Sequence, residues 1–143
     1  MIQIYLWGMD FKAMVRFRPE ELKFIEGNEL CRLATVDDKG QPHVVPVAYL
    51  YIGGKFYIAT DYGTRKLANI RRNNRVSLVV DRYRPNKAVL VLGEASILER
   101  GPEYRRIYRR FFQRFSWVRR SPWEEGEAAF IVVKPVRKVS WGL

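Results

Sequence analysis

Two hydroxyl groups and two cations come together in one short stretch of the sequence, at Thr60, Thr64, Arg65 and Lys66. The pattern predicts a helix over residues 63–74 with Thr64 as its N-cap. Hydroxyl groups, cations and the free N–H groups of a helix start are the partners that bind a phosphate monoester. Because cations at a helix N-terminus oppose the helix dipole, their position favours a bound anion over a merely solvated surface.

Few other side chains could carry chemistry. Cys31 is the single cysteine and His43 the single histidine, so an internal disulfide is excluded and we expect no metal site. A hydrolytic triad is not supported either, because a second histidine or a suitably placed carboxylate is missing. His43 could face a cofactor or a substrate, although we interpret it as a surface residue at a strand start. If the protein is an enzyme, a bound cofactor must supply the chemistry.

The composition is that of a globular domain, with 143 residues of which 48% are hydrophobic and 29% charged. The 26 Lys and Arg residues exceed the 15 Asp and Glu residues and give a net charge of +11. This excess favours anionic partners such as nucleic acid, acidic membranes or phosphorylated small molecules. The apolar residues 1–9 lack the basic region of a signal peptide, and no stretch approaches the roughly 18 apolar residues of a membrane span. We therefore expect a cytoplasmic protein that is not bound to a membrane.

The elements that must position these residues are apolar strands joined by turns. Strands are predicted over residues 31–36, 44–52, 55–60, 75–80, 87–98 and 128–140. Their order is a meander rather than an alternation of strands and helices, so we expect a mainly β protein with an antiparallel sheet or barrel. Pro46 cannot donate to a strand ladder, and its part of the strand must lie at an edge, a bulge or a ligand site. Gly93 is expected to bend the strand 87–98.

The remaining segments are predicted to be an N-terminal arm (1–17), a helix that begins near Pro19, and an amphipathic helix over 101–115. In the second helix aromatic and aliphatic residues recur on one side, as in a helix packed on a core, and arginines occupy the other side. We interpret the arginines as a solvated face. Nucleic-acid binding is disfavoured, and a lid that attracts an anionic substrate is a third interpretation. Residues 117–127 are expected to be irregular.

Residues 54–66 (GKFYIATDYGTRK) followed by 73–78 (NNRVSL) resemble the pyridoxamine 5′-phosphate oxidase-like, FMN-binding split-barrel family. Residues 33–43 are similar to that family's opening hairpin, and residues 134–141 (KPVRKVSW) are similar to its closing strand. The resemblance implies a single domain over residues 1–143 that forms a six-stranded antiparallel split β-barrel. It also implies a homodimer with two flavin sites at the subunit interface.

The same resemblance implies a role for several residues in binding FMN. Arg65 and Lys66 would hold the FMN phosphate, with hydrogen bonds from Thr60 and Thr64. The isoalloxazine ring would lie along four successive strand residues, Val44, Val45, Pro46 and Val47. Trp141 would approach the flavin from the other subunit. The resemblance assigns no catalytic side chain.

Two departures from the family pattern bear on the activity. In true pyridoxamine phosphate oxidases an arginine begins the flavin-side strand segment, where this sequence has Val44. Those enzymes also continue past the closing tryptophan into an Arg-Leu-His segment that grips the substrate, whereas this sequence ends at Leu143. We therefore doubt oxidation of pyridoxamine phosphate, and favour an oxidoreductase that passes hydride through a flavin to an unassigned small molecule. The alternatives are a reductase that uses the deazaflavin coenzyme, and a non-catalytic flavin- or nucleic-acid-binding protein.

Overall fold

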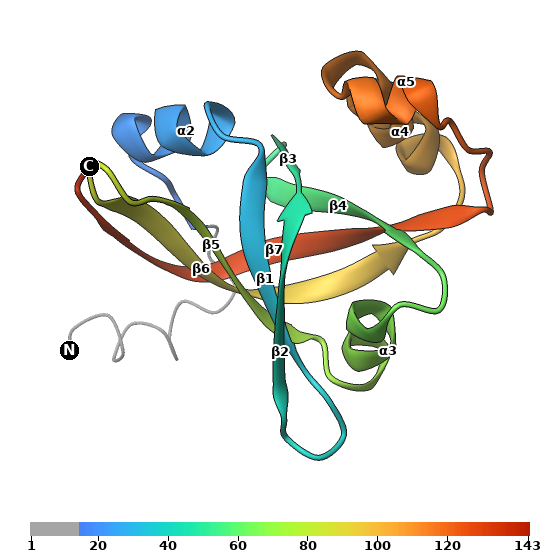
Figure 1. Ribbon diagram of the computed structural model, residues 1–143, viewed down its shortest axis with the longest axis horizontal. Coiled ribbons are helices and arrows are strands. Elements are labelled where there is room, and N and C mark those ends of the chain that lie inside the picture. Colours follow the sequence, from blue (N-terminus) through green and yellow to red (C-terminus); the bar gives the residue numbers. More distant parts are fainter. Residues whose placement is uncertain (1–14) are drawn as a thin grey trace.

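The computed structural model describes residues 15–143, so residues 1–14 of the expected N-terminal arm lie outside the described residues. One antiparallel sheet and several helices make up the described part (Figure 1). The strands are β1 (Leu30–Val36), β2 (Pro42–Ala48), β3 (Leu50–Ile52), β4 (Lys55–Asp61), β5 (Arg75–Arg82), β6 (Lys87–Leu98) and β7 (Ala128–Trp141). The helices are α2 (Pro19–Glu26), α3 (Arg65–Arg72), α4 (Pro102–Arg114) and α5 (Ser116–Arg120). The expected mainly β, antiparallel fold is confirmed.

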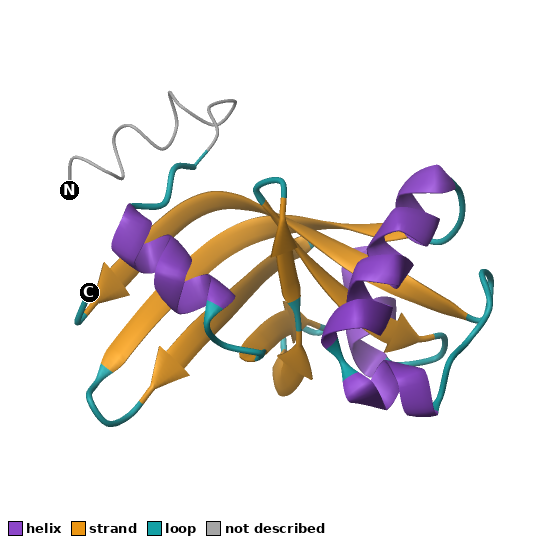
Figure 2. Ribbon diagram, turned by 90° about the horizontal axis from the view of Figure 1, so that it is seen from above, coloured by secondary structure: helices purple, strands orange, loops and turns teal. Residues whose placement is uncertain are grey.

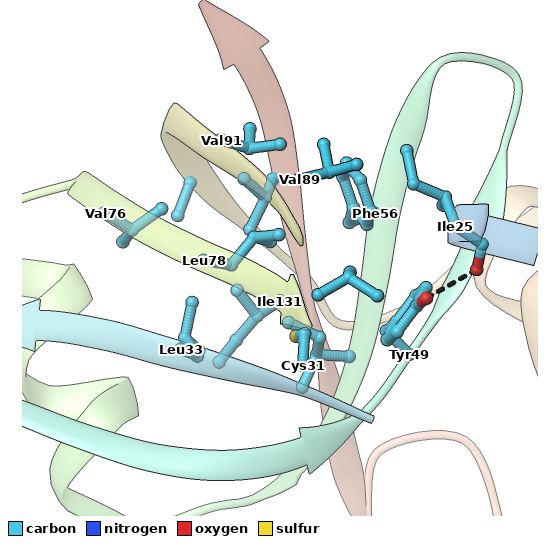
Figure 3. Packing of buried hydrophobic residues seen from close by; sticks show 14 of the residues in the cluster. Ile25, Cys31, Leu33, Tyr49, Phe56, Val76, Leu78, Val89, Val91 and Ile131 are labelled. Carbon is cyan, nitrogen blue, oxygen red and sulfur yellow. Dashed lines mark hydrogen bonds between the residues drawn. The ribbon is translucent and has the colours of Figure 1, made fainter. Parts of the chain in front are cut away.

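The sheet curls until its two edge strands meet. Its strand order is β2-β1-β5-β6-β7-β4-β3, so β2 and β3 lie at opposite edges although Tyr49 alone separates them in the chain. The Tyr49 amide donates to the Glu29 carbonyl at 3.1 Å, and its hydroxyl donates to the Ile25 carbonyl (Figure 3). The predicted strand 44–52 is divided here because its first part pairs with β1 and its second part with β4. The sheet therefore has seven strands where six were expected.

The curl encloses one hydrophobic core, and α4 and α5 cover a second one. The first core contains Ile25, Leu33, Phe56 and Ile131, all fully buried (Figure 3). Figure 2 shows α2 and the α4–α5 pair over the two ends of the sheet. The apolar stripe of α4 packs into the second core as predicted, with Tyr104, Ile107, Phe111 and Phe115 buried. The expectation of an irregular segment over 117–127 is wrong for residues 117–120, because Val118 also enters this core and holds a short helix there.

A buried ion pair joins α2 to the end of β7. The Glu21 carboxylate is 1% exposed and accepts hydrogen bonds from Lys138 Nζ, Ser140 Oγ and the Arg18 amide. Burial alone would raise the pKa of Glu21, but these three hydrogen bonds outweigh it and lower the pKa to about 2. No local pattern indicates this contact, because Glu21 and Lys138 lie far apart in the chain.

Candidate functional site

Helix α3 is held against β1 by three buried side chains. Leu67 and Ile70 enter the first core, and each is 3% exposed. The buried Asn69 donates its side-chain N–H to Thr35 Oγ1 at 2.9 Å. A hydrogen bond between two buried polar groups is costly to break, so this contact holds the middle of α3 against β1, near the β1–β2 hairpin (Figure 1).

The first turn of α3 brings both predicted hydroxyl groups together. Thr60 Oγ1 and Thr64 Oγ1 are 2.9 Å apart. Gly63 turns the chain between them with φ +85°, a left-handed conformation that favours glycine. Thr64 occupies the N-cap position as predicted, but its side chain makes no capping hydrogen bond. The first helical bond runs from the Ala68 amide to the Thr64 carbonyl at 3.2 Å, so the preceding amides have no partner inside the helix.

The two predicted cations of this turn lack carboxylate partners. Within residues 15–143 no carboxylate oxygen lies within 4.0 Å of Arg65 or Lys66. Lys66 is half-buried, and burial lowers its pKa, with a smaller opposing effect of the Asp61 charge. At the other end of α3, Arg71 lies 3.7 Å from Glu99 and Arg72 lies 3.6 Å from Asp38. The unpaired cations are therefore those of the first turn.

The β2 residues predicted to line the ring point to both faces of the sheet. Val44 and Pro46 are exposed, whereas Val45 and Val47 are half-buried. β2 is an edge strand, which is one of the three positions (an edge, a bulge or a ligand site) expected for the strand that contains Pro46. His43 is half-buried and not the surface residue that we expected; its Nδ1 atom is buried without a hydrogen-bond partner in the described chain. His43 lies opposite Thr35 in the β1–β2 ladder. Thr35 is the residue whose hydroxyl accepts the hydrogen bond from Asn69 of α3.

Trp141 does not join this cluster within one chain. β7 begins at Ala128, which pairs with Asp61, and ends at Trp141, which pairs with Ala88. The indole N–H of Trp141 donates to Asn86 Oδ1 at 3.1 Å, and the residue is 45% exposed. The structure thus brings Thr60, Thr64 and the two cations together and leaves Trp141 at the other end of β7.

The outer face of the sheet, turned away from the first core, carries exposed apolar side chains. These are Leu30, Val44, Val139 and Trp141, which are 59%, 63%, 44% and 45% exposed. The ladders place them on one side of β1, β2, β6 and β7, together with Ala34 and Leu90. An apolar face of this kind on a protein surface marks a site of association.

The arginines of α4 and α5 mostly have partners within the same region. Arg105 lies 3.0 Å from Glu125 and Arg114 lies 3.1 Å from Glu29. Arg119 donates to the Phe112 carbonyl at 2.6 Å, at the end of α4. This pattern agrees with the interpretation of the arginines as a solvated face.

Two further findings concern residues 15–143 as a whole. No helix there is long and apolar enough to cross a membrane. No group of three or more His, Cys, Asp or Glu side chains comes together there as a metal site would require. The Cys31 thiol is buried, and burial raises its pKa to about 12, which leaves it protonated at neutral pH.

Comparisons with known proteins identify the relatives of this chain. A family model for pyridoxamine 5′-phosphate oxidase matches residues 17–141. A 5a,11a-dehydrotetracycline/5a,11a-dehydrooxytetracycline reductase of Streptomyces rimosus is 33% identical over 104 residues, which span 63% of this chain and 70% of the reductase. These matches confirm the family resemblance.

Solved structures show the same fold. A FAD-binding protein of Mesorhizobium loti has 28% identity and a TM-score of 0.65, with 85% of this chain and 89% of that chain covered. The haem storage protein HutZ of Vibrio cholerae has 19% identity and a TM-score of 0.75, with 87% and 94% covered, a likeness of fold alone. The expected split-barrel architecture is thereby confirmed.

Proposed function

Because this chain belongs to the pyridoxamine 5′-phosphate oxidase family, we propose that it is a single-domain, FMN-binding oxidoreductase. The observation that carries the proposal is the first turn of α3. Arg65 and the half-buried Lys66 have no carboxylate within 4.0 Å among residues 15–143, and two hydroxyl groups lie beside them. A half-buried cation without a partner is costly, and a bound phosphate would remove that cost.

The residues of this turn fit a phosphate monoester. Arg65 and Lys66 would hold it by charge-assisted hydrogen bonds, and the partnerless amides of the first turn would donate to it. The hydroxyls of Thr60 and Thr64 can rotate to add two further bonds. The ring would then lie along β2, at Val44, Val45, Pro46 and Val47, where the sheet edge is open.

A bound flavin supplies hydride transfer at its N5 atom. The chain itself would bind and orient this group: the cations of α3 would neutralise the phosphate, and the apolar side chains of β2 would keep water from the ring. His43 lies opposite Thr35, which bonds to Asn69 of α3, and its Nδ1 atom is buried without a hydrogen-bond partner in the described chain. An imidazole at this position can hold or deliver a proton. We therefore place His43 at the border of the site.

The proposal extends to a homodimer through the outer sheet face. The exposed Leu30, Val44 and Val139 supply an apolar surface for a second copy. Since Trp141 lies at the far end of β7 from Asp61, the tryptophan that meets each flavin would come from the partner subunit. Two equivalent flavin sites would then lie at the interface.

The relative from Streptomyces supports reduction as the direction of the reaction. That enzyme is a reductase of dehydrotetracyclines, which are conjugated ring compounds. We propose that the substrate of this chain belongs to the same broad class, a conjugated planar ring. The phosphate ligands at α3 would serve the deazaflavin coenzyme as well as FMN, so the ligand itself must be identified.

The test is to purify the protein, record its visible absorption spectrum and identify the released ligand by mass spectrometry. We expect FMN, bound at one molecule per subunit of a dimer. If the released ligand is the deazaflavin coenzyme, the proposed binding site stands and only the identity of the cofactor changes. A colourless protein that takes up neither coenzyme would contradict the proposal, and a monomer in light scattering would contradict the shared site.

A further inference from the structure

The turn between β5 and β6 carries the most exposed aromatic side chain of residues 15–143. Tyr83 is 76% exposed, against 45% for Trp141 and 39% for Tyr62. The Arg84 guanidinium lies over the Tyr83 ring, with its Cζ atom 5.1 Å from the ring centroid. The arginine therefore orients the ring from one side, and most of the ring surface stays open to a further contact.

This turn is fastened to the end of β7, where Trp141 lies (Figure 1). The indole N–H of Trp141 donates to Asn86 Oδ1 at 3.1 Å. The next residue, Gly142, packs so closely on the turn that a Cβ atom there would clash with the Asn86 carbonyl oxygen and lie 3.1 Å from Lys87 Cα. Glycine permits this approach of two backbones. The turn and Trp141 therefore form one unit.

The ladders show which face of the sheet this unit borders. Asp81 pairs with Ala88 and Ala88 pairs with Trp141, so these three residues form a row on the outer face. Tyr83 follows two residues after Asp81, and the row therefore ends at the turn that bears Tyr83. Because the proposed homodimer covers the outer face with a second copy, that copy would meet the turn together with Trp141.

We propose that Tyr83 contacts the ring of the flavin bound by the partner subunit, beside Trp141 of the same chain. The inference rests on the proposed function, from which it takes the flavin and the homodimer. Each site would then combine the phosphate ligands of one subunit, Arg65 and Lys66, with two aromatic side chains of the other. Tyr83 is a positioning residue here: its ring packs on the flavin, and its hydroxyl takes no part in hydride transfer.

The first test compares FMN with riboflavin, which has the same ring and no phosphate, by fluorescence titration of the purified protein. Tyr83→Ala should weaken both ligands by the same factor, about fivefold, because a ring contact is lost. Tyr83→Phe keeps the ring and should stay within about twofold of the wild type for both. Unchanged affinities in Tyr83→Ala, or a loss confined to FMN, would overturn the inference.

A matched control comes from the same hairpin. Lys87 pairs with Arg82 in the row next to that of Asp81, and this row points to the other face of the sheet. Lys87→Ala should therefore leave the dissociation constants of FMN and riboflavin within about twofold of the wild type. A loss equal to that of Tyr83→Ala would mean that the hairpin as a whole is disturbed, and would contradict a specific contact of Tyr83.

A mixed dimer shows which subunit supplies the ring. One subunit carries Tyr83→Ala and the other Arg65→Ala/Lys66→Ala, each with its own affinity tag so that the mixed dimer can be purified. If Tyr83 acts across the interface, the first subunit keeps its phosphate ligands and receives an intact Tyr83. The mixed dimer should then bind one FMN with the wild-type dissociation constant. Absence of any site of wild-type affinity would contradict the inference.

Failure of this inference differs from failure of the proposed function. Arg65→Ala/Lys66→Ala should weaken FMN about a hundredfold and leave riboflavin within about threefold, because only FMN carries the phosphate. FMN binding that depends on Arg65 and Lys66 but not on Tyr83 would overturn this inference alone. A wild type that binds neither FMN nor riboflavin would overturn both the FMN site and this inference.

Discussion

Two lysines of this protein are partly withdrawn from water, and their surroundings differ. Lys138 is 24% exposed and its ammonium contacts the buried carboxylate of Glu21. Lys66 is half-buried at the start of α3, and within the described chain no carboxylate lies within 4.0 Å of it. A buried cation that pairs with a carboxylate stabilises the fold around it. A buried cation without a carboxylate partner is available to bind an anion from outside the chain.

The contrast also explains why net charge alone does not reveal a site. The arginines of α4 outnumber the cations of α3, but Arg105 and Arg114 have carboxylate partners. Arg65 and Lys66 have no such partner within 4.0 Å in residues 15–143, and they combine this with the burial of Lys66 and with two hydroxyl groups beside a helix start.

The largest expected effect is that of Lys138→Met. This substitution leaves the Glu21 carboxylate buried without its cation, and breaking such a pair costs about 3–5 kcal/mol. Urea denaturation at neutral pH should show that loss in the free energy of unfolding. A loss below about 1 kcal/mol would mean that the pair does not stabilise the contact between α2 and β7.

The same pair predicts an acid-sensitive stability. The pKa of Glu21 is about 2 in the folded protein against an ordinary 4.5, so its contribution is complete above pH 4.5 and is lost as the pH falls towards 2. The difference in unfolding free energy between wild type and Glu21→Gln should shrink by about 3 kcal/mol over that range. A difference that does not change with pH would show that Glu21 titrates normally.

Lys66→Met should behave in the opposite way to Lys138→Met. Without FMN the free energy of unfolding should stay within about 1 kcal/mol of the wild type or increase, since a half-buried unpaired charge is removed. The dissociation constant for FMN should rise at least about tenfold through loss of a charge-assisted hydrogen bond. Both quantities come from denaturation and fluorescence titration of the same preparation. A strong decrease in the free energy of unfolding would show instead that Lys66 stabilises the fold.

The smallest effect is expected for Arg109→Gln/Arg110→Gln on the exposed side of α4. If these arginines are a solvated face, the FMN dissociation constant should stay within about twofold. A larger loss of affinity, measured by the same titration, would support the alternative in which α4 covers the flavin site.

Much of this arrangement could be predicted from the sequence. Local signals were sufficient for the α4 stripe, for the edge position of Pro46 and for Thr64 at the N-cap, because each depends on neighbouring residues. The division of residues 44–52 at Tyr49 could not be predicted, since it depends on which distant strands pair with each half.

Two long-range contacts could not be predicted from the sequence, one at the candidate site and one between α2 and β7. Asn69 and Thr35 are 4% and 1% exposed and join each other, but neither residue type signals burial. The Glu21–Lys138 pair joins residues from opposite ends of the chain. Contacts of this kind follow from the fold rather than from any local pattern.

The central claim is that the first turn of α3 holds the phosphate of a flavin. The most direct measurement is the dissociation constant of FMN for Arg65→Ala/Lys66→Ala against Arg71→Ala/Arg72→Ala, which removes the same charge from the other end of the helix. We expect the first variant to bind FMN about a hundredfold or more weakly than the wild type, and the second to stay within about threefold. Equal losses in the two variants, or none in the first, would contradict the claim.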